Sequence, residues 1–343
     1  MKNLFIIFIT FFIVGNLFAQ RRPTRKPMLP KANLHKYDVN GDYLRINLVD
    51  ISELPEFVLK QENLNDLAIS FSDSLTQIPK SIKQVQTLKI IRITNTSVEE
   101  FPVGICHINS IENIYITSAP MTEIPKKIGK LTNLKYLTLR FVGINEFPKS
   151  IGKLKSLKEI TIHDTKVRTS MNDIVYEFEG IKTFPKQIGK LDSLQKLSFL
   201  RNGLEVLPNE VGGLKSLKHL NLYDNSLSTI PKEIGNLQNL EQLILGKNQI
   251  KSVPNEITNL SNLLKLDLSK NQLTSIPEDI DKLTNITGLF LSDNNLTTLP
   301  ESVGNMTWLK IISVKGNNIP EEELRALKKK LPNTRITNGK DIE

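Results

Sequence analysis

The residues of this chain that could do chemistry begin with its single cysteine, Cys106, and its four histidines. A cysteine nucleophile needs an activating base, and His107, the neighbour of Cys106, comes with no third catalytic partner. A lone cysteine cannot form an intrachain disulfide, which fits either a reducing compartment or a secreted fold without disulfides. We therefore expect Cys106 to be a small packed residue.

His163 and His219 invite a metal or hydrolase interpretation. Their positions in the repeat described below lie two strands apart and four residues offset, ~10 Å by ~13 Å at ordinary strand dimensions, so they cannot share one zinc ion. His163 and Asp164 have no aligned Ser or Cys, and adjacent strand residues face opposite ways, which argues against a catalytic triad.

Asp38, Asn40 and Asp42 are spaced like the start of a calcium-binding loop, but the rest of that loop is missing. The loop needs Gly at its sixth position and Glu at its twelfth, and this chain has Tyr43 and Val49 there. We expect no metal, no cofactor and no enzyme activity.

Prolines divide most of the chain at a nearly constant spacing of 23 residues. Around them recurs an apolar frame, LxxLxLxxNxLxxIPxxIxxL, most cleanly from Leu217 to Leu237. A fixed period of this length indicates a repeat architecture. The LxxLxL part alternates like a short strand with one buried face, and the residues after each proline predict a helical or 3-10 return segment. The prolines are Pro55, Pro79, Pro102, Pro125, Pro148, Pro185, Pro208, Pro231, Pro254, Pro277 and Pro300.

Two stretches, LKHLNLYDNSLSTIPKEIGNLQNL and LLKLDLSKNQLTSIPEDIDKLTNI, resemble the 23-residue leucine-rich repeats of bacterial proteins. They are also similar to the repeats of plant disease-resistance proteins and of animal Ras-pathway scaffolds. The resemblance covers about 280 residues. It implies an α/β solenoid, a leucine-rich repeat horseshoe with a parallel concave β-sheet and convex helical or 3-10 segments. It also implies binding through the concave face, without chemistry.

An asparagine recurs in register in the second half, at Asn202, Asn225, Asn248, Asn271, Asn294 and Asn317. A buried Asn has the donors and the acceptor that satisfy backbone groups at the turn after a strand. The matching earlier positions are Thr96, Ala119, Val142 and Thr165. Because Ala and Val cannot make those bonds, we expect a less regular and differently curved first half.

The chain start has the pattern of a secretory signal peptide over residues 1–19. Lys2 precedes an apolar run from Leu4 to Val14, and we expect cleavage after Ala19. No cysteine lies near the cut, so the protein is not expected to be a lipoprotein. The prediction is a secreted or periplasmic, cell-envelope protein. If the apolar start were retained, the chain would be an inner-membrane-tethered receptor, but the run is short for a span.

Four further segments follow from the same pattern. Residues 20–36 are rich in proline and positive charge and predict an extended linker, residues 37–319 hold about 11–12 repeats, and residues 320–343 predict a capping helix and tail. One proline spacing is 37 rather than 23, which places an insertion at 168–181 that contains Tyr176 and Phe178. An insertion at a solenoid turn is either functional or neutral, and both interpretations stay open.

The residues that alternate with the buried Leu and Ile point outward from the concave face. Tyr and Arg among them are typical of interface hot spots, so we expect this face to bind a protein partner, with the insertion tuning specificity. We expect a monomer. The predicted contact residues are Arg92, Tyr115, Tyr136, Arg140, Phe141, His163, Leu200, His219, Tyr223, Ile244 and Phe290.

The alternative is an envelope module that binds anionic glycan or lipid through its basic linker. Its contacts would be Arg21, Arg22, Arg25 and Lys26, which act through charge and therefore lose affinity at raised salt. No specific nucleic-acid site is expected. A hydrolase is a third class, for which the sequence offers no nucleophile, acid pair or metal cluster.

Overall fold

The computed structural model describes residues 36–37, 43–47, 52–72, 74–165, 168–171, 174–177 and 179–342. Residues 34–343 form one compact unit. The predicted signal peptide, Arg21, Arg22, Arg25, Lys26 and Phe178 lie outside the described residues. None of the helices within the described ranges has the length and apolar character of a membrane span.

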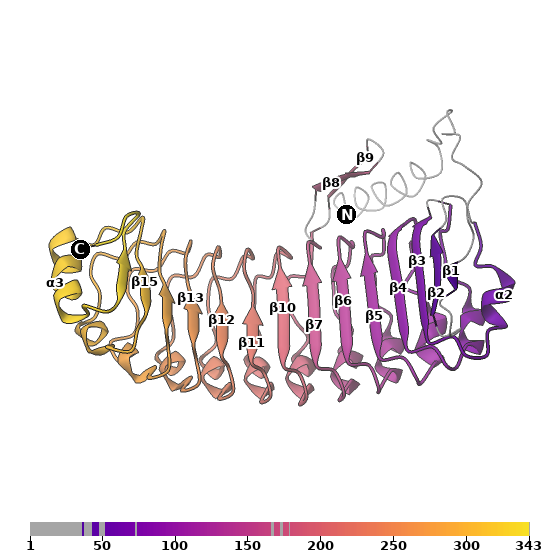
Figure 1. Ribbon diagram of the computed structural model, residues 1–343, viewed down its shortest axis with the longest axis horizontal. Helices are drawn as coiled ribbons and strands as arrows, with labels where there is room; N and C mark the ends of the chain where they lie inside the picture. Colours follow the sequence, from indigo (N-terminus) through magenta and orange to yellow (C-terminus); the bar gives the residue numbers. More distant parts are fainter. Residues whose placement is uncertain are drawn as a thin grey trace, which may run out of the picture. The chain divides into compact units, whose positions relative to one another are not determined.

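One 14-stranded sheet runs through the described part of this unit, and its strands lie side by side in chain order (Figure 1). β1 pairs antiparallel with β2, and every later neighbour is parallel. The strands are β1 (Lys36–Tyr37), β2 (Tyr43–Asn47), β3 (Asp66–Ser72), β4 (Ile90–Thr96), β5 (Asn113–Thr117), β6 (Tyr136–Arg140), β7 (Glu159–His163), β10 (Lys196–Leu200), β11 (His219–Asn221), β12 (Gln242–Ile244), β13 (Lys265–Asp267), β14 (Gly288–Phe290), β15 (Ile311–Ser313) and β16 (Arg335–Thr337).

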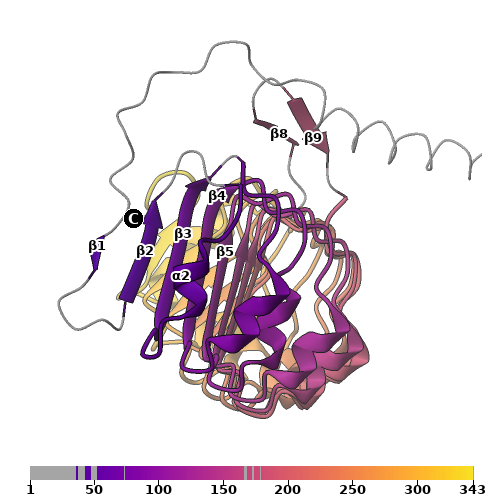
Figure 2. The same cartoon turned by 90° about the vertical axis from the view of Figure 1, so that its right-hand side faces the viewer.

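From β3 to β15, each strand of the sheet returns to the next through a 3-10 helix, which begins directly after the repeat proline in nearly every turn. In a typical turn Ile234 donates its backbone N–H to the carbonyl of Pro231 at 3.0 Å. Viewed from the β1 end, the sheet forms one side of each coil and the 3-10 helices lie across from it (Figure 2). These helices are η1 (Lys80–Gln84), η2 (Val103–His107), η3 (Lys126–Lys130), η4 (Lys149–Lys153), η5 (Lys186–Lys190), η6 (Asn209–Gly213), η7 (Lys232–Asn236), η8 (Asn255–Asn259), η9 (Ile280–Lys282) and η10 (Glu301–Asn305).

The core lies between the sheet and the 3-10 helices as a stack of apolar layers. Leu220 in β11 and Leu222 just past it are fully buried, as are Ile234 and Leu237 of the return segment. Burial of a Leu or Ile side chain contributes about 1.5–3 kcal/mol, so the repeated frame stabilises every layer in the same way. The predicted α/β solenoid with a parallel sheet and 3-10 return segments is confirmed.

The asparagines of the second half form a ladder along the carboxyl ends of the strands. Asn248 accepts a bond from the N–H of Leu227 at 3.0 Å and donates to the carbonyls of Leu222 and Leu245 at 3.0 and 2.8 Å. Asn271 and Asn294 repeat these contacts. The buried polar groups left by the tight turn are thereby satisfied.

The first half lacks these bonds and has longer strands. Ala119 and Val142 occupy ladder positions there and are buried among apolar side chains. β3 and β4 have 7 residues each, whereas β11 to β16 have 3 each. Backbone bonds between neighbouring coils nevertheless continue past the shorter strands, as from the N–H of Leu222 to the carbonyl of Ile244 at 2.8 Å.

The longer proline spacing corresponds to a hairpin of two antiparallel strands, β8 (Arg168–Met171) and β9 (Ile174–Glu177), which contains Tyr176. It interrupts the chain between β7 and η5, yet β7 and β10 remain direct neighbours in the sheet. In the core beside β10, Phe147, Phe184 and Phe199 pack together, with ring centroids 4.7 to 6.4 Å apart. The insertion therefore leaves the core continuous.

Two short α-helices lie near the two ends of the solenoid, α2 (Glu56–Leu59) and α3 (Glu321–Lys330). α3 begins after Pro320, carries acids in its first turn and lysines in its last, and buries Leu324 and Leu327. The predicted tail after this helix contains a further strand. The chain returns as β16, whose Ile336 pairs with Ile312 of β15, so the terminal segment adds a last strand to the sheet.

Candidate functional site

The outward-facing side chains of the sheet stand in three rows, because equivalent residues of neighbouring strands are in register. Tyr136 and His219 belong to the first row, and Arg92, Tyr115, Ile244 and Phe290 to the second. The third row, at the carboxyl end of the strands, contains Arg140, His163 and Leu200 in direct register. The predicted contact residues therefore divide among three rows.

They also extend over much of the sheet. Arg92 on β4 and Phe290 on β14 are eight strand steps apart, ~38 Å at the usual strand spacing. The guanidinium of Arg92 lies over the Tyr115 ring, 5.5 Å from its centroid, and forms an ion pair with Asp66. Phe290 packs under the Lys265 ammonium at 4.9 Å. These two pairs lie at opposite ends of the predicted set of contact residues.

Phe141 differs from the prediction in its placement. It lies one residue beyond β6, in a turn with φ of 51°, and it is 42% exposed. Alternation along the strand therefore does not govern where Phe141 points. The other apolar members of the predicted set are half-buried by their neighbours on the sheet.

Four of the predicted residues follow one another at the same level of neighbouring coils, and we call them the Arg140 row: Arg140, His163, Leu200 and Tyr223. Tyr223 continues the row just beyond β11. His219 is in register with Lys196 of β10, so Tyr223, four residues after His219, is level with Leu200, four residues after Lys196. Arg201 donates its backbone N–H to the carbonyl of Tyr223 at 3.3 Å. A cation, an imidazole, an aliphatic side chain and a phenol thus line four neighbouring strands, directly beside the turn that leads to the β8–β9 hairpin.

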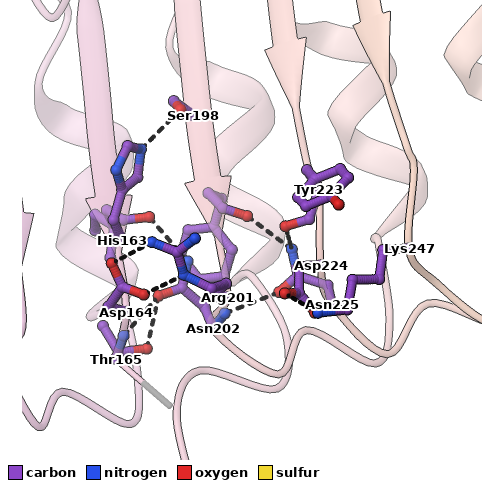
Figure 3. Close-up of polar contacts among 12 residues, drawn as sticks. His163, Asp164, Thr165, Ser198, Arg201, Asn202, Tyr223, Asp224, Asn225 and Lys247 are labelled. Carbon is purple, nitrogen blue, oxygen red and sulfur yellow. Dashed lines mark hydrogen bonds and ion pairs between the residues drawn. The ribbon is translucent and has the colours of Figure 1, made fainter. Parts of the chain in front are cut away.

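His163 contacts a serine that the sequence analysis did not align with it. Its Nε2 lies 3.0 Å from Oγ of Ser198 on β10, as Figure 3 shows. Burial lowers the pKa of His163, and the nearby Arg140 guanidinium lowers it further. The statement that no serine or cysteine accompanies His163 is therefore wrong.

The His163–Ser198 pair nevertheless lacks the rest of a catalytic constellation. Ser198 is only 5% exposed, which restricts access to its hydroxyl. The Asp164 carboxylate accepts from Nη2 of Arg201 at 2.9 Å and also from Nε, and it has no described hydrogen bond to His163. A triad needs an acid that orients the imidazole, and here the neighbouring acid is used by Arg201.

Separate from the three rows on the sheet, a line of charged residues lies at the turns just past the strands. Asp164, Arg201, Asp224 and Lys247 all have positive φ, between 53° and 61°, and each precedes the ladder position of its repeat (Figure 3). Asp164 pairs with Arg201, whose pKa is raised by that hydrogen bond, and Asp224 pairs with Lys247 at 2.6 Å. The acids and bases alternate from repeat to repeat, so this edge presents paired charges rather than a field of one sign.

Asn202 joins this edge to the end of β7. Its Oδ1 accepts bonds from the backbone N–H and the hydroxyl of Thr165, at 3.0 and 2.8 Å, and its Nδ2 donates to the carbonyl of Ile162. The first ladder asparagine therefore holds the chain where the inserted segment begins. The sequence analysis identified neither the charged turn residues as a set nor Ser198. The repeat spacings of 23 and 37 residues place the turn residues at equivalent positions, so these could have been found from the sequence.

The described residues offer neither a cluster of metal ligands nor an activated thiol. Across the described ranges no three His, Cys, Asp or Glu side chains come together as a metal site. Cys106 is buried in η2, and desolvation raises the pKa of its thiol to about 12. The thiolate needed for nucleophilic attack is therefore scarce at neutral pH.

Comparison with known proteins agrees with this architecture. Residues 192–250 and 238–296 match the family model described as leucine rich repeat. Residues 192–296 are therefore leucine-rich repeats, and the described fold around them is the leucine-rich repeat solenoid. No curated protein sequence matches it significantly.

Among solved structures, an internalin from Listeria monocytogenes is 20% identical, with 83% of this chain and 84% of that chain covered and a TM-score of 0.59. A TDR receptor is 24% identical, with 83% and 48% covered and a TM-score of 0.62, so this chain spans about half of it. A leucine-rich repeat protein of Leptospira interrogans is 25% identical, with 84% and 93% covered and a TM-score of 0.46. The likenesses to the internalin and the receptor show the fold.

Proposed function

We propose that this chain is an exported, non-enzymatic protein that binds a protein partner on the outward face of its sheet, centred on the Arg140 row. The observation that carries the proposal is the adjacency of Arg140, His163, Leu200 and Tyr223 on four neighbouring strands. Arg and Tyr are enriched at interface hot spots, and Leu200 adds apolar area between them. Arg140 is exposed and has no ion pair among the described residues.

The insertion supports the same location. It leaves the solenoid after Thr165, two residues past His163, and returns before Ile181. Inserted segments in repeat proteins generally fall on one face, often the binding face. We propose that the hairpin contributes contacts to a partner held on the Arg140 row and so narrows the choice of partner.

Capture from envelope and host extracts tests this function. Wild type is compared with Arg140→Ala/Tyr223→Ala, which removes one cation and one aromatic ring from the row. The control, Lys315→Ala/Phe290→Ala, also removes one cation and one aromatic ring, but from the far end of the sheet face. We expect the first variant to lose a captured protein that wild type and the control retain.

A third variant without residues 21–31 tests the alternative. The basic linker lies outside the described residues, so binding of anionic glycan or lipid through Arg21, Arg22, Arg25 and Lys26 remains a prediction. Capture that disappears only with this deletion, and that raised salt also abolishes, would assign binding to the linker and refute the role of the Arg140 row.

A further inference from the structure

The 3-10 side of the solenoid has a charge pattern that partner binding on the sheet face does not explain. η3, η4 and η5 carry seven lysines and no acidic residue. All seven side chains are exposed. We call them the lysine surface: Lys126, Lys127, Lys130, Lys149, Lys153, Lys186 and Lys190.

The lysine surface is regular because the repeat is regular. Lys126, Lys149 and Lys186 are the first residues of η3, η4 and η5, and a second row is formed by the last residues of the same helices. Neighbouring turns stack at ~5 Å, the spacing of the strands. First and last residues of a five-residue 3-10 helix are ~8 Å apart along its axis. Two parallel rows of ammonium groups therefore share one side of three adjacent coils.

Folding alone gives no reason for these lysines. The helix dipole favours acids in a first turn and disfavours cations there, yet Lys126, Lys149 and Lys186 occupy that place. η6, η8 and η10 have the same backbone conformation with an acid in the first turn and no lysine. The same coil therefore forms without the positive charges, and crowding them together costs Coulomb energy.

The lysines are also largely unneutralised. Among the described residues only Lys186 of the seven has an ion pair, with Glu210 at 3.7 Å and with both side chains exposed. Glu123 and Glu146 lie in the loops before η3 and η4 but form no described ion pair with the seven. Such a surface attracts an anionic ligand at a distance shorter than the screening length.

The form of the surface favours a planar ligand. Ile128, Ile151 and Ile188 of the three helices point into the core and are fully buried, so the surface has no apolar group to insert. The two described hollows, near Leu54 and near Phe290, include none of the seven lysines. Clusters of four to eight basic residues are typical of proteins that bind anionic lipid headgroups.

We propose that the lysine surface holds the protein against an anionic lipid membrane by charge alone. The 3-10 helices would face the headgroups. The sheet face, across the coil from them (Figure 2), would remain free. This inference is independent of the partner proposed for the Arg140 row.

Vesicle co-sedimentation of the full chain tests the proposal. The probes are phosphatidylcholine vesicles with and without phosphatidylglycerol. Binding to vesicles of phosphatidylcholine alone measures the charge-independent binding that comes from the apolar run of Leu4 to Val14. The variant Lys126→Gln/Lys130→Gln/Lys149→Gln/Lys153→Gln is compared with Lys232→Gln/Lys251→Gln/Lys270→Gln/Lys310→Gln, which removes the same charge from exposed lysines elsewhere.

We expect the phosphatidylglycerol-dependent affinity to fall roughly tenfold or more in the first variant and much less in the second, with raised salt reducing wild type in the same way. Equal affinities of the two variants would overturn the proposal. It would also be overturned if the first variant kept its vesicle binding and lost only its binding to heparin, because the ligand would then be a linear polyanion. Circular dichroism checks that both variants are folded.

Discussion

Nε2 of His163 lies 3.0 Å from Oγ of Ser198, although the two residues are 35 positions apart in the chain. The contact is diagonal, because Ser198 is in register with Thr161 and not with His163. It fixes one imidazole nitrogen within the sheet face. The other groups around His163 are Arg140 on β6, Asp164 on its own strand end, and Lys196 and Arg201 from β10 and the turn after it.

This environment predicts a specific pH dependence of stability. Burial and Arg140 hold the pKa of His163 below its value in the unfolded chain, so the unfolded state takes up a proton first as pH falls. The stability contributed by neutral His163 is present above the unfolded pKa of ~6.5 and is lost as pH falls through the lower folded pKa. Urea unfolding between about pH 7.5 and about pH 5 should show a larger loss of stability for wild type than for His163→Gln. Equal losses would contradict the assigned shift.

The asparagine ladder should contribute strongly to stability. Asn248→Ala leaves the buried N–H of Leu227 without its partner and takes one of two side-chain donors from the carbonyls of Leu222 and Leu245, which keep Asn225 and Asn271. At about 1–3 kcal/mol for an unsatisfied buried group, we expect a loss of roughly 1–3 kcal/mol in the free energy of unfolding. The control, Asn262→Ala, removes one exposed bond to the carbonyl of Gln238. Chemical denaturation of both variants measures the difference, and similar midpoints would refute the ladder's role.

Glycine in the 3-10 turn is required by the approach of the next coil. A Cβ at Gly235 would lie 2.3 Å from the backbone oxygen of Glu256, whereas at the equivalent Gly304 the nearest atom is Cδ of the flexible Lys330 side chain, at 2.9 Å. We expect Gly235→Ala to cost about 1–3 kcal/mol of stability, as overpacking does. Gly304→Ala should be nearly neutral. Thermal melts distinguish them, and a neutral Gly235→Ala would show that the coils separate easily.

Cys106 should be unreactive in the folded protein. With its pKa raised to about 12 by burial, the thiol carries little thiolate near neutral pH. We expect slow reaction with Ellman's reagent in buffer and rapid, stoichiometric reaction in denaturant. Rapid labelling of the native protein would show that η2 opens or that the thiol is activated.

Much of the fold is predictable because one frame recurs. The register that aligns Leu197 with Leu220 and Leu243 follows from the 23-residue period alone, and so does the chain of ladder asparagines. β16 could not be foreseen, since Arg335–Thr337 is a three-residue strand whose apolar pattern is too short to distinguish it from a tail.

The site was less predictable, because side-chain contacts depend on more than register. Alternation predicts which residues face outward, and the repeat spacing aligns Arg140, His163 and Leu200 in one row. It does not reveal that Arg92 is already paired with Asp66, that Ser198 reaches His163, or that Phe141 lies past its strand in a left-handed turn. These depend on side-chain length and turn geometry, which periodicity does not encode.

Site-specific photo-crosslinking in cells that naturally produce the protein tests the central claim most directly. A benzophenone amino acid is placed at Leu200, in the middle of the Arg140 row, or at Lys232, an exposed position on the 3-10 side. The account predicts one discrete protein adduct from position 200 that Arg140→Ala/Tyr223→Ala abolishes, and no such adduct from position 232. An adduct from position 232 alone, or one from position 200 that survives the double substitution, would contradict it.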